Sequence, residues 1–209
     1  MLYISKFKHC IFDFDGVIID SEKKKFKNLQ EILKKYDFDL NEDCFFDFVG
    51  KKRVYFIKEL KNERLNFHLK EIMDEVHKKD FDLDDLVLIP GLIDFLCFLK
   101  NNNVEAHIAT GSSQDFVFKV LELFKIKKYF SHILTGDQVK ESKPSPKIYL
   151  ELRRKINNES AFVIEDSSAG IISAKKAKFF VISLIEHDES DLFVSDFFEL
   201  LKIISWYLL

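Results

Sequence analysis

The sequence has few of the residues that hold small secreted or metal-stabilised proteins together. Only three of its 209 residues are cysteines, Cys10, Cys44 and Cys97. They are odd in number and widely spaced, which fits neither a disulfide framework nor a metal-binding motif. We therefore predict three buried apolar thiols in a reducing compartment.

Targeting and membrane-spanning patterns are also missing. The first ten residues, MLYISKFKHC, have no apolar core of the kind that a signal peptide needs. The longest apolar stretch, residues 86–99, is interrupted by Pro90, Gly91 and Asp94 and is shorter than the ~20 residues of a membrane span. These features predict a soluble, cytoplasmic protein.

Neither sign of charge dominates. The chain has 32 basic and 35 acidic residues and a net charge of -3, too little to attract nucleic acid or an anionic membrane. At 47% hydrophobic and 32% charged residues it is an ordinary globular protein. At about 150 residues per domain, its length fits one domain, or one domain that carries an insertion.

Two kinds of pattern divide the chain. From residue 22 to about residue 83, apolar residues recur at helical spacings, and no strand pattern is present. We predict helices at residues 22–36, 54–60 and 65–76, and a short segment up to Phe48 that Asn41 caps. This part of the chain is therefore predicted to be an all-helical insert.

Outside the insert, strand and helix patterns alternate. Strands are predicted to begin at residue 9 and to span residues 104–110, 132–135, 161–164 and 179–184. Helices are predicted at residues 92–100, 113–124, 144–154, 169–177 and 196–206. Such alternation predicts a doubly wound parallel sheet. The resulting α/β core comprises residues 1–20 and 88–209, and the helical insert comprises residues 21–87.

Polar clusters follow three of the predicted strands, at the edge where such sheets bind their ligands. The clusters are DFDG at residues 13–16, TGSS at 110–113 and EDSS at 165–168. Four carboxyl groups that meet at one edge would suit Mg²⁺, which prefers hard oxygen ligands. The other interpretation of each cluster alone is turn and helix-cap chemistry, for which Asp and Ser are common.

A phosphate site can be predicted beside these acids. Thr110, Gly111 and Ser112 lead from a strand into a helix, where hydroxyls and backbone N–H groups can surround an anion. Lys143 lies in a short loop, SKPSP, that two prolines stiffen. A metal, an anion site and a lysine together are what phosphoryl transfer needs.

Four motifs in this order resemble the haloacid dehalogenase superfamily, in particular its β-phosphoglucomutase-like group of phosphatases with a small helical cap. The motifs are DFDGVIIDSE, ATGSS, KPSPKIY and VIEDSSAGIISAKKA, and the resemblance spans residues 9–184. It implies that Asp13 is a nucleophile that becomes an aspartyl-phosphate, and that Asp15 is the general acid and base. Thr110 and the backbone at Gly111 would bind phosphoryl oxygens, and Lys143 would balance their charge.

The resemblance also implies a metal site and a cap. Mg²⁺ would be held by Asp13, the carbonyl of Asp15 and Asp166, with Glu165 either a direct ligand or a residue behind the ligands. The helical insert would be the mobile cap that excludes water and selects the substrate. In that cap, Arg53 ends a GKKR loop and could grip a second phosphate or a carboxylate of the substrate.

These features predict a Mg²⁺-dependent phosphatase of a small phosphorylated metabolite, such as a sugar phosphate, phosphoglycolate or a nucleoside monophosphate. Asp15 argues against C–halogen cleavage, because dehalogenases lack it, and against a phosphonatase that would use Lys51 or Lys52. A sugar-phosphate mutase is the main alternative, although Lys25 stands where mutases carry a histidine. A phosphometabolite-binding protein without turnover is the other, although it would have little use for Asp15. The six histidines fall in no motif, and we assign them no role.

Overall fold

The computed structural model describes residues 6–48, 53–80, 83–84 and 86–205. The chain forms two compact units. The α/β unit contains Met1–Ile19 and Leu88–Leu209, and the helical unit contains Asp20–Val87. Each unit has its own hydrophobic core. The helical unit therefore interrupts the α/β unit in sequence.

The α/β unit is built on a six-stranded sheet in the order β3-β2-β1-β4-β5-β6, with all neighbouring strands parallel. The strands are β1 (His9–Phe12), β2 (Glu105–Ala109), β3 (Phe130–Leu134), β4 (Ala161–Glu165), β5 (Phe180–Ser183) and β6 (Leu192–Phe193). This is the order of a Rossmann-like sheet. The order reverses direction between β1 and β4, and sheets of this kind bind their ligands beyond the carboxyl ends of the two strands at such a reversal.

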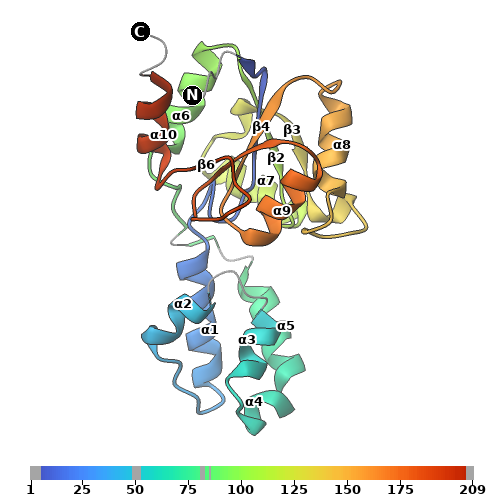
Figure 1. Ribbon diagram of the computed structural model, residues 1–209. Coiled ribbons are helices and arrows are strands. Elements are labelled where there is room, and N and C mark those ends of the chain that lie inside the picture. Colours follow the sequence, from blue (N-terminus) through green and yellow to red (C-terminus); the bar gives the residue numbers. More distant parts are fainter. Residues whose placement is uncertain (1–5, 49–52, 81–82, 85, 206–209) are drawn as a thin grey trace. The chain divides into compact units, whose positions relative to one another are not determined.

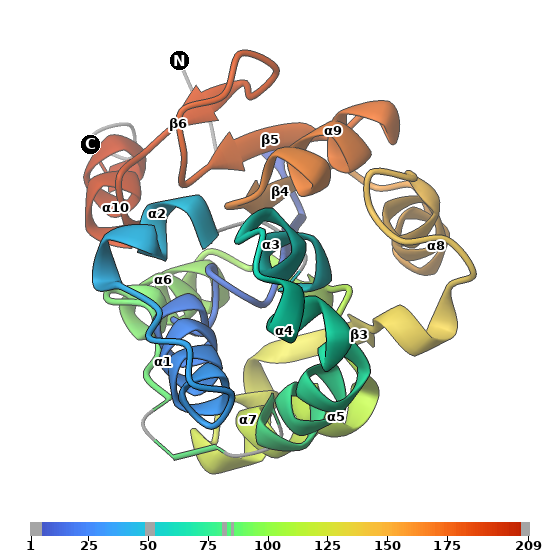
Figure 2. The ribbon, with the colours of Figure 1, turned by 90° about the horizontal axis from the view of Figure 1, so that it is seen from below.

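Helices cover both faces of this sheet (Figure 2). On one face, α8 (Lys147–Lys155) and α9 (Ser168–Lys176) pack against Ile11, Val163 and Val181. On the other face, Phe12 contacts Phe95 of α6 (Leu92–Asn101) and Phe197 of α10 (Phe197–Ser205). Ile11 and Phe12 point to opposite faces because side chains alternate along a strand. The remaining long helix, α7 (Gln114–Leu123), connects β2 to β3 (Figure 1).

The helical unit contains no strand among its described residues. Its helices are α1 (Glu22–Lys34), α2 (Phe45–Phe48), α3 (Arg53–Glu59), α4 (Glu63–Phe67) and α5 (Leu69–Asp80), with a short 3₁₀ helix, η2 (Glu42–Cys44). As predicted, Asn41 caps the segment that ends at Phe48, since its side chain accepts the N–H of Asp43. Phe26, Phe48 and Phe56 meet edge to face in the core of this unit.

The fold class predicted from the sequence, a doubly wound α/β core with an all-helical insert, is confirmed. Two predicted helices were wrong in detail. The single helix at residues 65–76 is two helices, α4 and α5, with His68 between them. The helix predicted to begin at Pro144 begins at Lys147, because two prolines keep residues 144–146 out of a regular helix.

The prediction for the cysteines was only partly correct. All three are free, but only Cys10 is buried, whereas Cys44 is half-buried and Cys97 is exposed on α6. Helical periodicity alone does not say which edge of an amphipathic helix reaches solvent.

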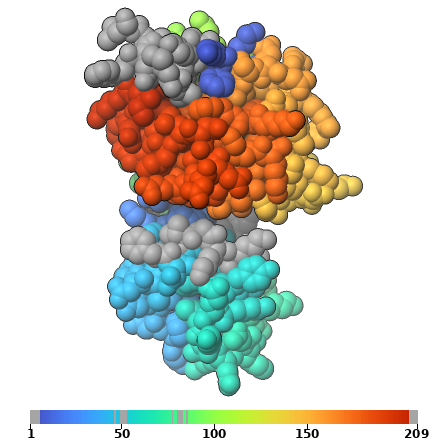
Figure 3. All heavy atoms as spheres, viewed as in Figure 1, coloured from blue at the N-terminus to red at the C-terminus, as the bar shows by residue number. Residues whose placement is uncertain are grey.

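No described helix is long and apolar enough to cross a lipid bilayer. The visible face of the α/β unit in Figure 3 is made mostly of the last third of the chain, coloured orange to red.

Candidate active site

The carboxyl ends of β1 and β4 bring three acidic residues together. Asp13 follows β1, Glu165 ends β4 and Asp166 follows it, and one ligand oxygen from each lies within 4.8 Å of the others. The backbone positions them, since the N–H of Asp13 donates to the carbonyl of Ile164 at 3.0 Å and continues the pairing of β1 with β4. The acids therefore lie at the point where the strand order reverses.

Lys143 provides the cation among these acids. Its Nζ lies 2.5 Å from Oδ1 of Asp13 and 2.6 Å from Oε1 of Glu165, and it donates to the carbonyl of Ala109 at 3.1 Å. One ammonium group thus contacts the ends of β1, β2 and β4. Because Lys143 reaches the site from the loop before α8, its position depends on three strands and one loop that are far apart in sequence.

Glu165 is fully buried and has partners on both of its oxygens. Oε1 accepts from Tyr149 at 2.6 Å as well as from Lys143. Oε2 accepts from the hydroxyl of Ser167 at 3.1 Å. A Cβ on Gly170 would lie 1.9 Å from this carboxylate, so a glycine is required where α9 passes Glu165. These contacts hold the carboxylate in one position.

Sequence analysis assigned no role to Tyr149 or Gly170. Tyr149 was present in the KPSPKIY motif, and its place on an apolar helix face predicts a core residue. In the structure it is fully buried, with its hydroxyl on Glu165 and its ring 5.1 Å from Nζ of Lys143. A buried tyrosine hydroxyl needs a partner. That requirement is the one signal in the sequence that could have linked Tyr149 to the acids.

Gly16 makes room for Asp166. It has a φ of 76°, in the left-handed region that favours glycine, and a Cβ at this position would lie 1.7 Å from Oδ2 of Asp166. The turn after β1 can therefore approach the end of β4 only because residue 16 has no side chain. The Asp-Gly pair that resembles an ordinary turn in the sequence also shapes the acidic site.

The second aspartate and the hydroxyl-rich loop also meet. The hydroxyl of Ser112 donates to Oδ2 of Asp15 at 2.5 Å, and the N–H of Ser112 donates to Oγ1 of Thr110 at 3.0 Å. Thr110 is buried, while a Cβ on Gly111 would meet no atom within 4 Å. The loop that follows β2 therefore lies beside Asp15 and leaves open space at Gly111.

The electrostatics of the site show an excess of negative charge. Burial raises the pKa of Asp13 to about 7, with Glu165 and Asp15 adding to the rise and Lys143 opposing it. Burial and the neighbouring Asp13 and Glu165 raise the pKa of Asp166 well above its usual value. Burial acts to lower the pKa of Lys143, but Asp13 and Glu165 more than offset this, and the net shift is strongly upward. The lysine is therefore charged.

A magnesium ion fits this set of residues. The donors are carboxylate oxygens, which suit Mg²⁺ better than softer metals. Burial and mutual repulsion disfavour the charged forms of Asp13 and Asp166, and a divalent cation between them would relieve that repulsion. Glu165 is the least suited to bind the ion directly, because both of its oxygens already accept hydrogen bonds.

Arg53, the predicted substrate contact, belongs to the helical unit and is far in sequence from the acidic residues. Arg53 is the first residue of α3 and is half-buried, and Gly50, Lys51 and Lys52 before it lie outside the described residues. Lys25, at the position where mutases carry a histidine, is in α1 and pairs with Glu22 at 2.9 Å.

The acidic site lies where the strand order of a Rossmann-like sheet reverses, which is typical of α/β enzymes. Comparison with known sequences identifies the family. The chain belongs to the haloacid dehalogenase-like hydrolases, whose family description matches residues 10–184. Relatives named as phosphatases agree with an enzyme that hydrolyses phosphoric monoesters.

Two sequence relatives and one solved structure illustrate the similarity. "Phosphorylated carbohydrates phosphatase" of Thermotoga maritima is 31% identical over 87% of this chain and 86% of its own length. "Beta-phosphoglucomutase" of Bacillus subtilis is 28% identical over 85% of this chain and 83% of its own length. The crystal structure of β-phosphoglucomutase from Clostridium difficile, 24% identical, shares the fold with a TM-score of 0.71, covering 97% of this chain and 99% of that one.

Proposed function

We propose that this enzyme is a Mg²⁺-dependent phosphatase that hydrolyses a small phosphorylated metabolite through an aspartyl-phosphate on Asp13. The observation that carries the proposal is the placement of Lys143 between Asp13 and Glu165, with Asp166 beside them. A carboxylate nucleophile with a fixed ammonium group is the arrangement that attack on a phosphoryl group requires.

In the first step, a carboxylate oxygen of Asp13 attacks phosphorus and the bond from phosphorus to the leaving oxygen breaks. Asp15 donates a proton to that oxygen, and the alcohol leaves. In the second step, Asp15 accepts a proton from a water molecule that attacks phosphorus, and the aspartyl–phosphorus bond breaks. Phosphate is released and both aspartates return to their starting state.

The other residues act on charge and position. Lys143 balances the charge of Asp13 and of the phosphoryl oxygens, and Thr110, Gly111 and Ser112 donate hydrogen bonds to those oxygens. Asp13, the carbonyl of Asp15 and Asp166 would hold Mg²⁺, with Glu165 behind them. When bound, the ion supplies positive charge that offsets the repulsion between the carboxylates and the phosphoryl group. The hydrogen bond from Ser112 holds Asp15 near the site before the substrate binds.

The substrate class is proposed from the relatives. A phosphatase of phosphorylated carbohydrates is 31% identical to this chain, so we propose a sugar phosphate ahead of phosphoglycolate and nucleoside monophosphates. Arg53 of the helical unit is proposed to grip a second phosphate or a carboxylate of that substrate, because its guanidinium group can bind either one bidentately.

A mutase is the second candidate, because a relative named β-phosphoglucomutase is 28% identical to this chain. Mutase activity needs a phosphoenzyme that is protected from water. The lysine at residue 25 pairs with Glu22 and offers no imidazole there. We therefore place the phosphatase first.

Phosphate release from a panel of phosphorylated metabolites tests both candidates. We expect Mg²⁺-dependent release from a few related sugar phosphates and none in EDTA. Release that continues unchanged in EDTA would contradict the metal dependence. If no compound releases phosphate, β-glucose 1-phosphate with a bisphosphate activator should be tested, and isomer interconversion there would favour the mutase.

A further inference from the structure

Three of the six histidines meet on one face of the sheet, although they are scattered in the sequence. His9 lies in β1, His107 in β2 and His132 in β3, and strand pairing places Ile11 beside His107 and His107 beside His132. Side chains in register on parallel strands share a face, and so do residues two apart on one strand. Sequence analysis assigned the histidines no role, because this arrangement depends on the order of the strands.

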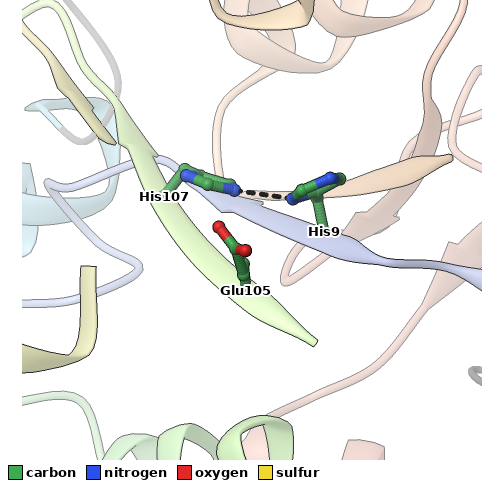
Figure 4. A group of neighbouring side chains, drawn as sticks. All are labelled: His9, Glu105 and His107. Atoms are coloured by element: carbon green, nitrogen blue, oxygen red, sulfur yellow. Dashed lines mark hydrogen bonds between the residues drawn. The ribbon is translucent and has the colours of Figure 1, made fainter. Parts of the chain in front are cut away.

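Two of these rings are in contact. Nδ1 of His9 lies 2.9 Å from Nε2 of His107, and the carboxylate of Glu105 points toward the gap between the rings (Figure 4). One ligand atom from each of His9, Glu105 and His107 lies within 4.8 Å of the others. His9 is 8% exposed and His107 is fully buried, whereas Glu105 is exposed. The two imidazole rings of the group are thus buried, and its carboxylate, on Glu105, is accessible to solvent.

The group is distinct from the acidic site. His9 and Asp13 are four residues apart along an extended strand, which corresponds to about 13 Å at 3.3 Å per residue. His9 begins β1 and Asp13 follows its last residue, so the two groups lie at opposite ends of the strand. No residue belongs to both.

We propose that His9, His107 and Glu105 bind a divalent transition-metal ion of the zinc class at the amino end of the sheet. Two imidazole nitrogens and one carboxylate are a donor set that suits zinc and its neighbours and does not suit Mg²⁺. In a tetrahedral site with Zn–N bonds of 2.0–2.1 Å, the two nitrogens would be about 3.3 Å apart. The rings need to separate by about 0.4 Å to admit the ion.

The surroundings supply neutral rings and negative charge. Burial lowers the pKa of His107 to about 3, and neighbouring His9 and His132 add to this effect; burial also lowers the pKa of His9. Metal ligation requires neutral imidazole, and Nδ1 of His9, which faces Nε2 of His107, can bind an ion without a change of tautomer. Glu105 and Glu159 bring two carboxylates to His9, and the cation Lys8 pairs with Glu159 at 2.8 Å.

The second ring nitrogen of His9 also faces a suitable group. Nε2 is buried without a hydrogen-bond partner and lies 3.7 Å from Oε2 of Glu159. Histidines that bind metals through one nitrogen usually direct the other N–H at a carboxylate or carbonyl group. The carboxylate of Glu159 can accept the Nε2–H of His9 when Nδ1 of His9 binds the ion.

Binding requires one proton to move within His107. Its Nδ1 accepts the backbone N–H of His132 at 3.2 Å, so in the metal-free protein the ring carries its proton on Nε2 and donates it to His9. A metal at Nε2 requires the proton to sit on Nδ1. Metal binding therefore switches the tautomer of His107 without releasing a proton from either histidine. The bond with the N–H of His132 is lost, and the ring must turn so that its Nδ1–H no longer faces that N–H.

The test uses the full chain, without any affinity tag, dialysed against Zn²⁺ in excess Mg²⁺ so that the acidic site is occupied. We expect one bound zinc ion per chain. Glu105→Gln should weaken zinc binding by about 100-fold, because even residues behind the ligands contribute 10- to 100-fold. Glu105 is exposed, so this change leaves the fold intact. The matched control is His132→Gln, which keeps the backbone N–H and should bind zinc as the wild type does.

A second measurement reads the tautomer directly. In ¹⁵N NMR of the histidine rings, zinc should convert Nδ1 of His107 from an unprotonated to a protonated nitrogen. The ring of His187, which lies in the segment between β5 and β6, should stay unchanged. The proposal fails if no zinc binds, if Glu105→Gln binds zinc as tightly as the wild type, or if the His107 tautomer does not change. Zinc retained by Glu105→Gln would indicate another site, such as the exposed thiol of Cys97.

Discussion

The two ends of β1 carry opposite chemistry on one short strand. Its carboxyl end delivers Asp13 to two further carboxylates and a lysine, and its amino end delivers His9 to a second imidazole and Glu105. The first group consists of buried carboxyl groups around the charged Lys143, and the second has neutral rings in its buried part. A parallel sheet can therefore present hard oxygen donors at one end and borderline nitrogen donors at the other.

The difference predicts unequal energetic consequences. Buried charges depend strongly on their partners, because an uncompensated charge in the interior is costly. A neutral hydrogen-bonded pair depends on its partner much less. The acidic end should thus be sensitive to the loss of the Lys143 cation, whereas the histidine end should tolerate the loss of one ring.

The largest effect is expected for the proposed nucleophile. Asp13→Asn keeps the size of the side chain but removes the attacking oxygen, so turnover should fall by about three to six powers of ten. The measurement is phosphate release from the best substrate of the panel at saturating Mg²⁺. The control is Asp94→Asn on the exposed surface of α6, which should leave the rate unchanged. Residual activity above about 1% would rule out the covalent mechanism.

Removal of the buried cation should have the largest effect on stability. Lys143→Met leaves Asp13 and Glu165 without their shared partner, and we expect the free energy of unfolding to fall by about 3–5 kcal/mol. At the other end of the sheet, His9→Gln removes one neutral hydrogen bond and should cost about 1 kcal/mol. Urea unfolding of both variants measures the difference. Equal losses would show that the two ends do not differ as proposed.

A smaller loss is expected for the tyrosine behind Glu165. Tyr149→Phe removes one donor from a buried carboxylate that keeps its contact with Lys143, so the free energy of unfolding should fall by about 1–3 kcal/mol. Tyr129→Phe is the matched control, since the hydroxyl of Tyr129 lies on the surface and makes a weak contact of 3.6 Å with the Sγ of Cys97. If both variants are equally stable, the Tyr149 hydroxyl contributes nothing to holding Glu165.

The smallest effect is expected at a turn near the amino end of the sheet, between α9 and β5. Lys178 has a φ of 61°, in the left-handed region, where a side chain is strained. Lys178→Gly should therefore raise the free energy of unfolding by up to about 1 kcal/mol. A rise in the thermal midpoint with unchanged phosphate release is the expected result. A drop would mean that the lysine side chain contributes more than the strain costs.

The sequence analysis succeeded where a local pattern carries the information. Short apolar segments predict β1 to β5, although not the two-residue β6, and Asn41 predicts a cap because its side chain satisfies a nearby N–H. It was wrong where packing against other elements decides the outcome. One predicted helix is split at His68, and Cys97 is exposed. The catalytic roles of Asp13, Asp15, Lys143 and Asp166 stay predictions, and the structure shows only which of these groups lie near one another.

The amino-acid sequence by itself determined the α/β class, the helical insert and the polar residues at three strand ends, because side-chain periodicity and motif spacing are properties of contiguous residues. Only the tertiary structure decided which distant residues meet. The contact of Tyr149 with Glu165, the approach of Gly16 to Asp166 and the pairing of His9 with His107 join residues from different elements. Strand order and register create these contacts, and neither can be deduced from any single segment.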